Sequence, residues 1–189
     1  MGALVRPAVL PLPIPEMPPL MRAASIDSLL QAVASVPADL RSLPERHIVM
    51  LRGSRRLLLL DQGSLRAAFP VAVGMPGWDT PTGRFKVLEK IKKPIWVHPV
   101  TGQRVEEQGP DNPLGSHWIA FHKDCLGRDA HDGDRWITIK GCTTTGFHGT
   151  PHRWTVGRAI SHGCVRLYNE DVKSLYRQVS LGMRVTVLP

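Results

Sequence analysis

Hydrophobic and polar positions after the first quarter of the chain follow the pattern of short strands joined by turns. Two apolar segments, 47–51 and 55–60, flank Arg52-Gly53-Ser54, a connection short enough for a β-hairpin. Asp61-Gln62-Gly63 forms a second turn before a third strand over 64–73. The three strands predict an antiparallel meander at the start of a sheet.

The rest of this region predicts further strands and one helix. Asn169 is a good N-cap, the acidic residues that follow it suit the positive end of a helix, and Gly182 ends the pattern. The apolar residues between these positions share one helical face: Val172, Leu175, Tyr176 and Val179. Strands are predicted over 84–91, 116–121, 136–140 and 183–188. The pattern indicates a mainly β fold with one helix in its C-terminal region.

The first 46 residues have a different pattern. Prolines gather between residues 7 and 19, and because proline fixes φ and lacks an amide proton, we expect this stretch to be extended and poorly packed. Only residues 25–35 show the spacing of a short helix. We interpret the segment 1–46 as a proline-rich linker or tether, and residues 47–188 as the folded domain.

Composition and charge narrow the class of protein. Apolar residues make up 42% and charged residues 21%, values typical of a folded globular protein. Lysine and arginine number 24 against 16 aspartates and glutamates, and the resulting net charge of +8 suits anionic surroundings such as nucleic acid, lipid headgroups or an acidic polymer. No helix-turn-helix, zinc-finger or RNP-like pattern accompanies the charge, which argues against nucleic acid. No apolar run approaches the roughly 20 residues of a membrane span, which excludes an integral membrane protein.

Reactive side chains gather within residues 141–167. Cys164 is the candidate nucleophile, and a thiol needs a nearby base or positive charge to act as one. On a strand, His162 would share a face with Cys164, but His148 on an adjacent strand could reach the thiol as well. The spacing leaves both histidines open as the base. Gly163 has no side chain, so backbone amides around the cysteine could closely approach a developing oxyanion.

A zinc site is an alternative use of the same residues. Histidine and cysteine are common zinc ligands, and this stretch offers four: His148, His152, His162 and Cys164. Their spacing, H-x3-H-x9-H-x-C, matches no standard zinc site, and no carboxylate lies among them. The residues therefore favour cysteine chemistry without a metal.

Two short motifs frame this chemistry. The first is Phe147-His148-Gly149-Thr150, and the second is Ser161-His162-Gly163-Cys164-Val165-Arg166. Together, in this order, they resemble the signature of the L,D-transpeptidase (YkuD-type) catalytic domain family. Three other segments agree with that family: 69–74, 80–85 and 112–115. The resemblance covers about residues 47–188.

The resemblance implies a β-rich catalytic domain that is sandwich-like or barrel-like. It assigns Cys164 as the nucleophile and His148 as the general acid and base, with the carbonyl of Gly149 orienting the imidazole. Backbone amides at His162, Gly163 and Cys164 would form the oxyanion hole. The two-step route through a thioester needs no cofactor and no metal.

Several neighbouring residues have roles that the sequence leaves open. Arg166, where some relatives carry asparagine, would bind a substrate carboxylate or form an internal salt bridge. Thr150 is a second candidate for substrate binding, and His162 is expected to shape the pocket. Cys125 and Cys142 could pair in an oxidising envelope, which would leave the third cysteine free.

The activity that the resemblance implies is acyl transfer on peptidoglycan. Cys164 would attack the carbonyl of the third residue of a tetrapeptide stem, release D-alanine and pass the acyl group to an amine of another stem, giving a 3→3 crosslink. The same acyl-enzyme would serve an L,D-carboxypeptidase or the attachment of a wall protein. A non-catalytic peptidoglycan-binding module is the alternative from another class.

The expected partners are peptidoglycan stem peptides and an anionic cell-wall polymer. The expected location is the periplasm or cell envelope. The sequence adds no convincing export signal, because Pro7, Pro11 and Pro13 interrupt the apolar run that such a signal requires.

Overall fold

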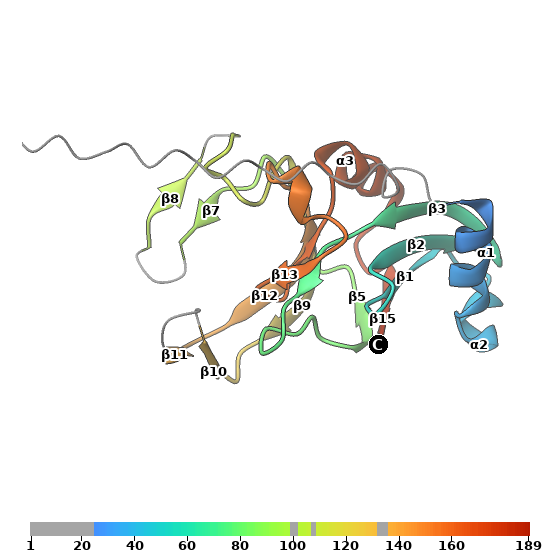
Figure 1. Ribbon diagram of the computed structural model, residues 1–189, viewed down its shortest axis with the longest axis horizontal. Coiled ribbons are helices and arrows are strands. Elements are labelled where there is room, and N and C mark those ends of the chain that lie inside the picture. Colours follow the sequence, from blue (N-terminus) through green and yellow to red (C-terminus); the bar gives the residue numbers. More distant parts are fainter. Residues whose placement is uncertain (1–24, 99–101, 107–108, 132–135) are drawn as a thin grey trace, which may run out of the picture.

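The computed structural model describes residues 25–98, 102–106, 109–131 and 136–189 (Figure 1). The architecture is mainly β, as predicted, with two larger sheets and no closed barrel in these parts of the chain. The first sheet has five strands in the order β3 (Ser64–Pro70), β2 (Arg56–Asp61), β1 (His47–Leu51), β15 (Arg184–Leu188) and β5 (Gly83–Lys86). The second has four, in the order β14 (Val165–Arg166), β12 (Thr143–His148), β9 (His117–Asp124) and β6 (Glu89–Lys92).

Smaller elements complete the fold. Three two-stranded pairs are β4 (Val73–Gly74) with β13 (Ala159–Ser161), β7 (Trp96–Val97) with β8 (Arg104–Val105), and β10 (Arg128–His131) with β11 (Trp136–Ile139). The helices are α1 (Ile26–Ala34), α2 (Ala38–Arg41) and α3 (Asn169–Gln178), and a 3₁₀ turn spans Arg153–Thr155. Within the described residues, no helix is both long and apolar enough to cross a membrane.

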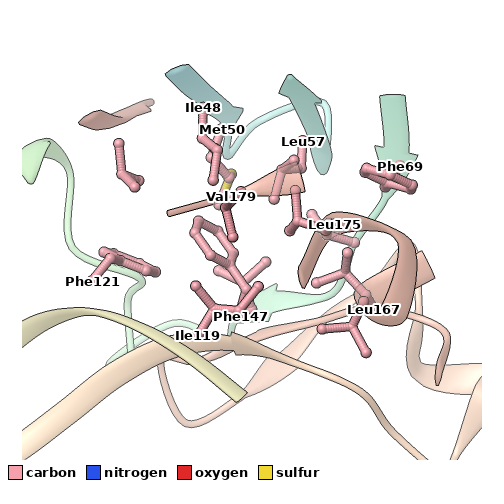
Figure 2. Packing of buried hydrophobic residues seen from close by; sticks show 14 of the residues in the cluster. Ile48, Met50, Leu57, Phe69, Ile119, Phe121, Phe147, Leu167, Leu175 and Val179 are labelled. Carbon is pink, nitrogen blue, oxygen red and sulfur yellow. The ribbon is translucent and has the colours of Figure 1, made fainter. Parts of the chain in front are cut away.

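The two larger sheets face one another across the main hydrophobic core. Figure 2 shows Ile48, Met50 and Leu57 of the first sheet pointing toward Ile119 and Phe147 of the second. All five side chains are fully buried, and burying one large apolar side chain contributes about 1.5–3 kcal/mol. This core fixes the position of the second sheet, on which the chemistry lies.

The first sheet is covered on both faces, which explains the uninterrupted leucine run in β2. Leu57 and Leu59 point into the main core. Leu58 and Leu60 belong to a second core with Ala32, Val36 and Leu40. The helices α1 and α2 lie over this side of the sheet (Figure 1). A strand with two buried faces has a continuous rather than an alternating apolar pattern.

The helices at the start of the described chain belong to the folded body. Ser25 caps α1, because its Oγ accepts a hydrogen bond from the Ser28 amide at 3.2 Å. Ala32, Val36 and Leu40 are buried in the second core. The expectation of a poorly packed linker is therefore wrong for this stretch. The proline cluster over 7–19 lies outside the described residues.

The predicted strand over 84–91 is two strands in different sheets. β5 pairs with β15, whereas β6 pairs with β9. Between them the Val87 amide donates to the Met183 carbonyl and the Leu88 amide to the Ala120 carbonyl, each at 2.8 Å. Single-sequence periodicity missed this crossing, because both halves keep an extended backbone.

Candidate active site

The pairing of β12 with β14 brings the candidate residues together. The two strands run parallel, with His148 opposite Arg166 and Phe147 opposite Val165. Phe147 and Val165 point into the core. Because side chains alternate along a strand, His148 and Arg166 share the opposite face, and Cys164 lies in the turn directly before β14. The half-buried Cys164 thiol lies 3.8 Å from the Thr144 carbonyl oxygen of β12.

His148 is held in one orientation inside the protein. His148 is only 3% exposed, and its ring stacks on that of Trp118, with the ring centroids 5.8 Å apart. Its Nδ1 lies 2.6 Å from the Gly149 carbonyl oxygen. A carbonyl only accepts hydrogen bonds, so Nδ1 carries the proton and the lone pair of the neutral ring lies on Nε2. This is the orienting contact that the family resemblance implies for Gly149.

Burial keeps His148 neutral. Desolvation, the largest cause, and the positive charge of Arg166 together lower the pKa of His148 to about 4, against the opposite effect of the carbonyls of Gly149 and Leu114. The imidazole is therefore an unprotonated base at neutral pH.

Two hydroxyl groups hold the turn that carries the cysteine. Ser161 Oγ donates to the Cys164 carbonyl at 2.5 Å and accepts from the Gly163 amide at 3.2 Å. Thr80 Oγ1 donates to the Gly163 carbonyl at 2.9 Å and accepts from the Gly74 amide at 3.0 Å. Gly163 has φ of 107°, a conformation that favours glycine. The Gly163 amide, expected in the oxyanion hole, is thus bonded to Ser161.

Thr80 is a residue that the sequence analysis missed. It lies in the segment 80–85 that agrees with the family, but nothing in its local pattern assigns it a contact with Gly163. The two residues are 83 positions apart, and both are buried. Only the three-dimensional fold brings them together.

The loop after His148 is fixed by Asn169. The Asn169 side chain accepts from the Ser116 amide at 2.9 Å and donates to the Thr150 carbonyl at 3.4 Å. A Cβ added at Gly149 would lie 2.1 Å from Asn169 Oδ1, so this close approach requires glycine. The prediction of Asn169 as an N-cap is wrong by one position: Tyr168 precedes the helix, and Asn169 bonds to other loops instead.

Arg166 has no carboxylate partner among the described residues. Arg166 is half-buried. Burial lowers the pKa of its guanidinium, and the charge of Cys164 acts on that pKa in the opposite direction. Within the described ranges, other arginines form ion pairs within 4.0 Å but Arg166 does not. Of the two roles that the sequence left open, the internal salt bridge is not seen in the described parts of the chain.

The other expected residues lie at the edge of this arrangement. The ring of the exposed His162 lies nearly perpendicular to that of Trp78, with the centroids 4.6 Å apart. Thr150 is buried, and its Oγ1 accepts from the amide of the exposed His152 at 3.1 Å. In the part of the chain that the structure describes, no three His, Cys, Asp or Glu side chains come close enough to hold a metal ion. The geometry therefore does not assemble the alternative zinc site.

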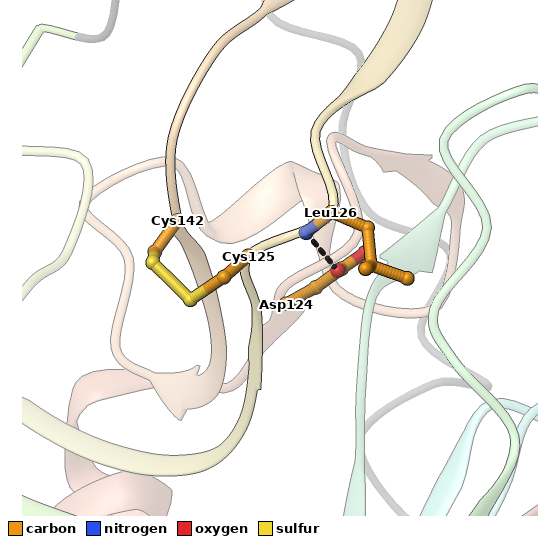
Figure 3. The surroundings of a disulfide bond; sticks show 4 residues. All are labelled: Asp124, Cys125, Leu126 and Cys142. Atoms are coloured by element: carbon orange, nitrogen blue, oxygen red, sulfur yellow. Dashed lines mark hydrogen bonds between the residues drawn. A yellow bond between two sulfur atoms is a disulfide. The ribbon is translucent and has the colours of Figure 1, made fainter.

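Cys125 and Cys142 form a disulfide, which answers a question that the sequence left open (Figure 3). The bond lies just beyond the last residue pair of β9 and β12, Asp124 opposite Thr143. It closes the base of the β10–β11 hairpin and leaves Cys164 as the free cysteine. The Leu126 amide donates to the Asp124 carboxylate at 2.9 Å beside it.

Known proteins are similar to this chain in sequence and in fold. Residues 45–187 match the YkuD family, the L,D-transpeptidase catalytic domain. YqjB of Bacillus subtilis (strain 168), named as a candidate L,D-transpeptidase, is 28% identical over 141 residues, which cover 75% of this chain and 70% of YqjB.

Two solved structures share the fold. The catalytic domain of the E. faecium L,D-transpeptidase has a TM-score of 0.54 and 18% identity, over 77% of this chain and 98% of that one. LdtMt1 in complex with imipenem has a TM-score of 0.51 and 17% identity, over 76% of this chain and 58% of that one. These two likenesses concern the fold, and the match over residues 45–187 concerns the family. The chain belongs to the L,D-transpeptidase catalytic domain family.

Proposed function

We propose that this protein transfers acyl groups between peptidoglycan stem peptides, with Cys164 as nucleophile and His148 as general base and acid. The observation that carries the proposal is the placement of the neutral, oriented His148 imidazole opposite Arg166 on the β12–β14 pair, with Cys164, the cysteine outside the disulfide, directly before β14. The family match supplies the class of reaction.

The first half of the reaction forms a thioester. Nε2 of His148 accepts the thiol proton as the sulfur attacks the carbonyl carbon of the third stem residue. The C–N bond to the terminal D-alanine breaks, and the imidazolium returns its proton to the leaving amine. Amides of the turn at Cys164 would stabilise the oxyanion.

The second half resolves the thioester. An amine from the third residue of another stem attacks the thioester carbonyl and loses a proton to His148. The C–S bond breaks, and the thiolate recovers that proton. The product is a 3→3 crosslink, and no cofactor enters either half.

Arg166 completes the site as the receptor of a substrate carboxylate. Its charge attracts the thiolate of Cys164, and its low-dielectric surroundings strengthen any pairing with an incoming carboxylate. The terminal D-alanine carries such a group next to the bond that breaks. This role fits a half-buried arginine to which the described residues offer no carboxylate partner.

The cell envelope is the compartment that fits this reaction. The substrate lies outside the cytoplasm, and the Cys125–Cys142 disulfide is of the kind that persists in oxidising compartments.

The decisive experiment incubates the protein with purified tetrapeptide muropeptides and identifies the products by mass. We expect a dimer linked through two third-position residues, and no product from Cys164→Ala. A tripeptide alone would select carboxypeptidase action by water. Binding of the muropeptides without any Cys164-dependent product would contradict the proposal and select a binding module.

A further inference from the structure

A hollow lies away from the reactive cysteine, between the two larger sheets. It measures about 980 Å³ and is lined by β5, the second half of β9 and the loop that joins α3 to β15. Cys164, His148 and Arg166 do not line it. Phe121, which does, points into the core between the sheets, the side opposite to His148. We call this hollow the basic groove and define it by Arg84, Phe85, Lys86, Lys123, Leu181 and Arg184.

Cations dominate the walls of the basic groove. Five lysines and arginines line it against a single carboxylate: Arg46, Arg84, Lys86, Lys123 and Arg184 against Glu45. Three of the arginines are paired: Arg46 with Asp61 at 2.7 Å, Arg184 with Glu45 at 3.1 Å and Arg84 with Asp39 at 3.5 Å. The exposed Lys86 and Lys123 have no ion pair within the described residues. The charges of these two lysines therefore remain available to attract anions.

The groove also has an apolar surface beside these charges. Phe85 is half-buried, and its ring contacts Phe121 and His122 at centroid distances of 5.5 and 4.9 Å. Leu88 and Leu181 are 53% and 66% exposed. Exposed leucines next to a cationic rim indicate a ligand with both an apolar side and negative charges.

We propose that the basic groove binds a linear acidic glycan, distinct from the peptide chemistry at Cys164. Carboxylates of the polymer would pair with the rim cations, and the C–H faces of its sugar rings would lie on the leucines and Phe85. Nucleic acid fits less well, because binding of single strands relies on exposed aromatic rings for base stacking, and the exposed apolar residues here are aliphatic. The groove would hold the domain on an anionic wall polymer.

The test measures binding of polygalacturonate, a linear glycan with one carboxylate per sugar, to the full chain. We expect binding that weakens as salt rises, and none to neutral dextran. Lys86→Glu with Lys123→Glu should weaken binding about tenfold or more. The matched control, Arg104→Glu with Lys140→Glu, makes the same charge change on two hairpins elsewhere and should alter the affinity less than twofold. Equal weakening of polygalacturonate binding by both pairs of substitutions would show that the basic groove is not the binding site.

A second pair of variants tests the glycan assignment. Leu88→Ser with Leu181→Ser should weaken polygalacturonate binding severalfold and leave the binding of a phosphodiester polymer, poly(glycerol phosphate), unchanged. Unchanged polygalacturonate binding in this variant would contradict the assignment of an acidic glycan as the ligand. Tighter binding of oligo-dT or poly(glycerol phosphate) than of polygalacturonate, at equal charge, would contradict it as well. Labelling of Cys164 by a carbapenem should be unchanged in all groove variants, so failure here is distinguishable from failure of the proposed reaction.

Discussion

At the residue scale, the account depends on His148. The ring is buried, its Nδ1 is fixed by the Gly149 carbonyl at 2.6 Å, and its charge state is set by desolvation. His162 has a different environment: it is exposed, and its ring lies nearly perpendicular to that of Trp78. Sequence spacing alone left both histidines open, and the two environments predict different pH behaviour for their variants.

Glutamine variants of the two histidines should differ in the pH profile of Cys164 acylation. His148→Gln removes the proton acceptor, so acylation at neutral pH should fall about 10²–10⁴-fold and the residual rate should rise toward alkaline pH. His162→Gln should lower the rate but keep the neutral-pH limb. Acylation rates measured across pH decide the matter. Loss of the neutral limb in His162→Gln alone would make His162 the base.

The low pKa of His148 also predicts how folding stability depends on pH. The pKa of His148 is about 4 in the folded protein, whereas an ordinary histidine, as in the unfolded chain, has a pKa of 6.5. The unfolded chain therefore binds the proton more tightly. Stability is therefore complete above about pH 6.5 and is lost as pH falls toward 4. The loss between pH 7 and 4.5 is roughly 2–3 kcal/mol.

Urea unfolding at both pH values measures this contribution. His148→Gln should lose less stability on acidification by about that amount. Burial raises the pKa of Asp171 to about 6, which acts in the opposite sense over the same range, but both proteins share this group and the comparison removes it. Equal losses in the two proteins would show that His148 is not buried as a neutral base.

At the element scale, the position of Cys164 is set by contacts between distant segments. β14 consists of Val165–Arg166, and the turn before it is held by hydroxyls from Ser161 and Thr80. Such a short strand has no periodicity of its own, so the sequence did not predict it. The two motifs identified the chemistry, but the pairing of β12 with β14 that unites them is a property of the fold.

Thr80→Val should slow the reaction while the protein remains folded. The change keeps the shape of the side chain but leaves the Gly163 carbonyl and the Gly74 amide unpaired, at a cost of about 1–3 kcal/mol for each buried group. A displaced turn should reduce acylation of Cys164 about 10–100-fold. Thr80→Ser, which retains the hydroxyl, is the control. Unchanged acylation in Thr80→Val would show that this contact does not position the cysteine.

Truncation tests the second core. Removing residues 1–40 deletes the buried side chains of Ala32, Val36 and Leu40 and exposes Leu58 and Leu60. Burial of each of these two exposed leucines contributes about 1.5–3 kcal/mol. We expect a lower melting temperature and aggregation. Removal of residues 1–24 keeps this core and serves as the control. A melting temperature shared by both truncated forms would contradict the packing of α1 and α2.

At the scale of the whole molecule, the sequence predicted the fold class but not its layers. The leucine run at 57–60 correctly indicated a strand, yet its partner helices lie in a segment whose prolines suggested a linker. The strand order was also hidden, because β15, near the end of the chain, pairs parallel to β1 in the middle of the first sheet. Contacts between residues more than a hundred positions apart leave no local pattern.

The measurement that tests the central claim most directly is intact-mass analysis after incubation with imipenem. Imipenem is a β-lactam whose strained carbonyl resembles the donor amide. We predict one covalent adduct on the parent protein, mapped by peptide analysis to Cys164, and none on Cys164→Ala. The disulfide keeps Cys125 and Cys142 unreactive in both proteins. An adduct elsewhere, or none on the folded parent protein, would contradict the account.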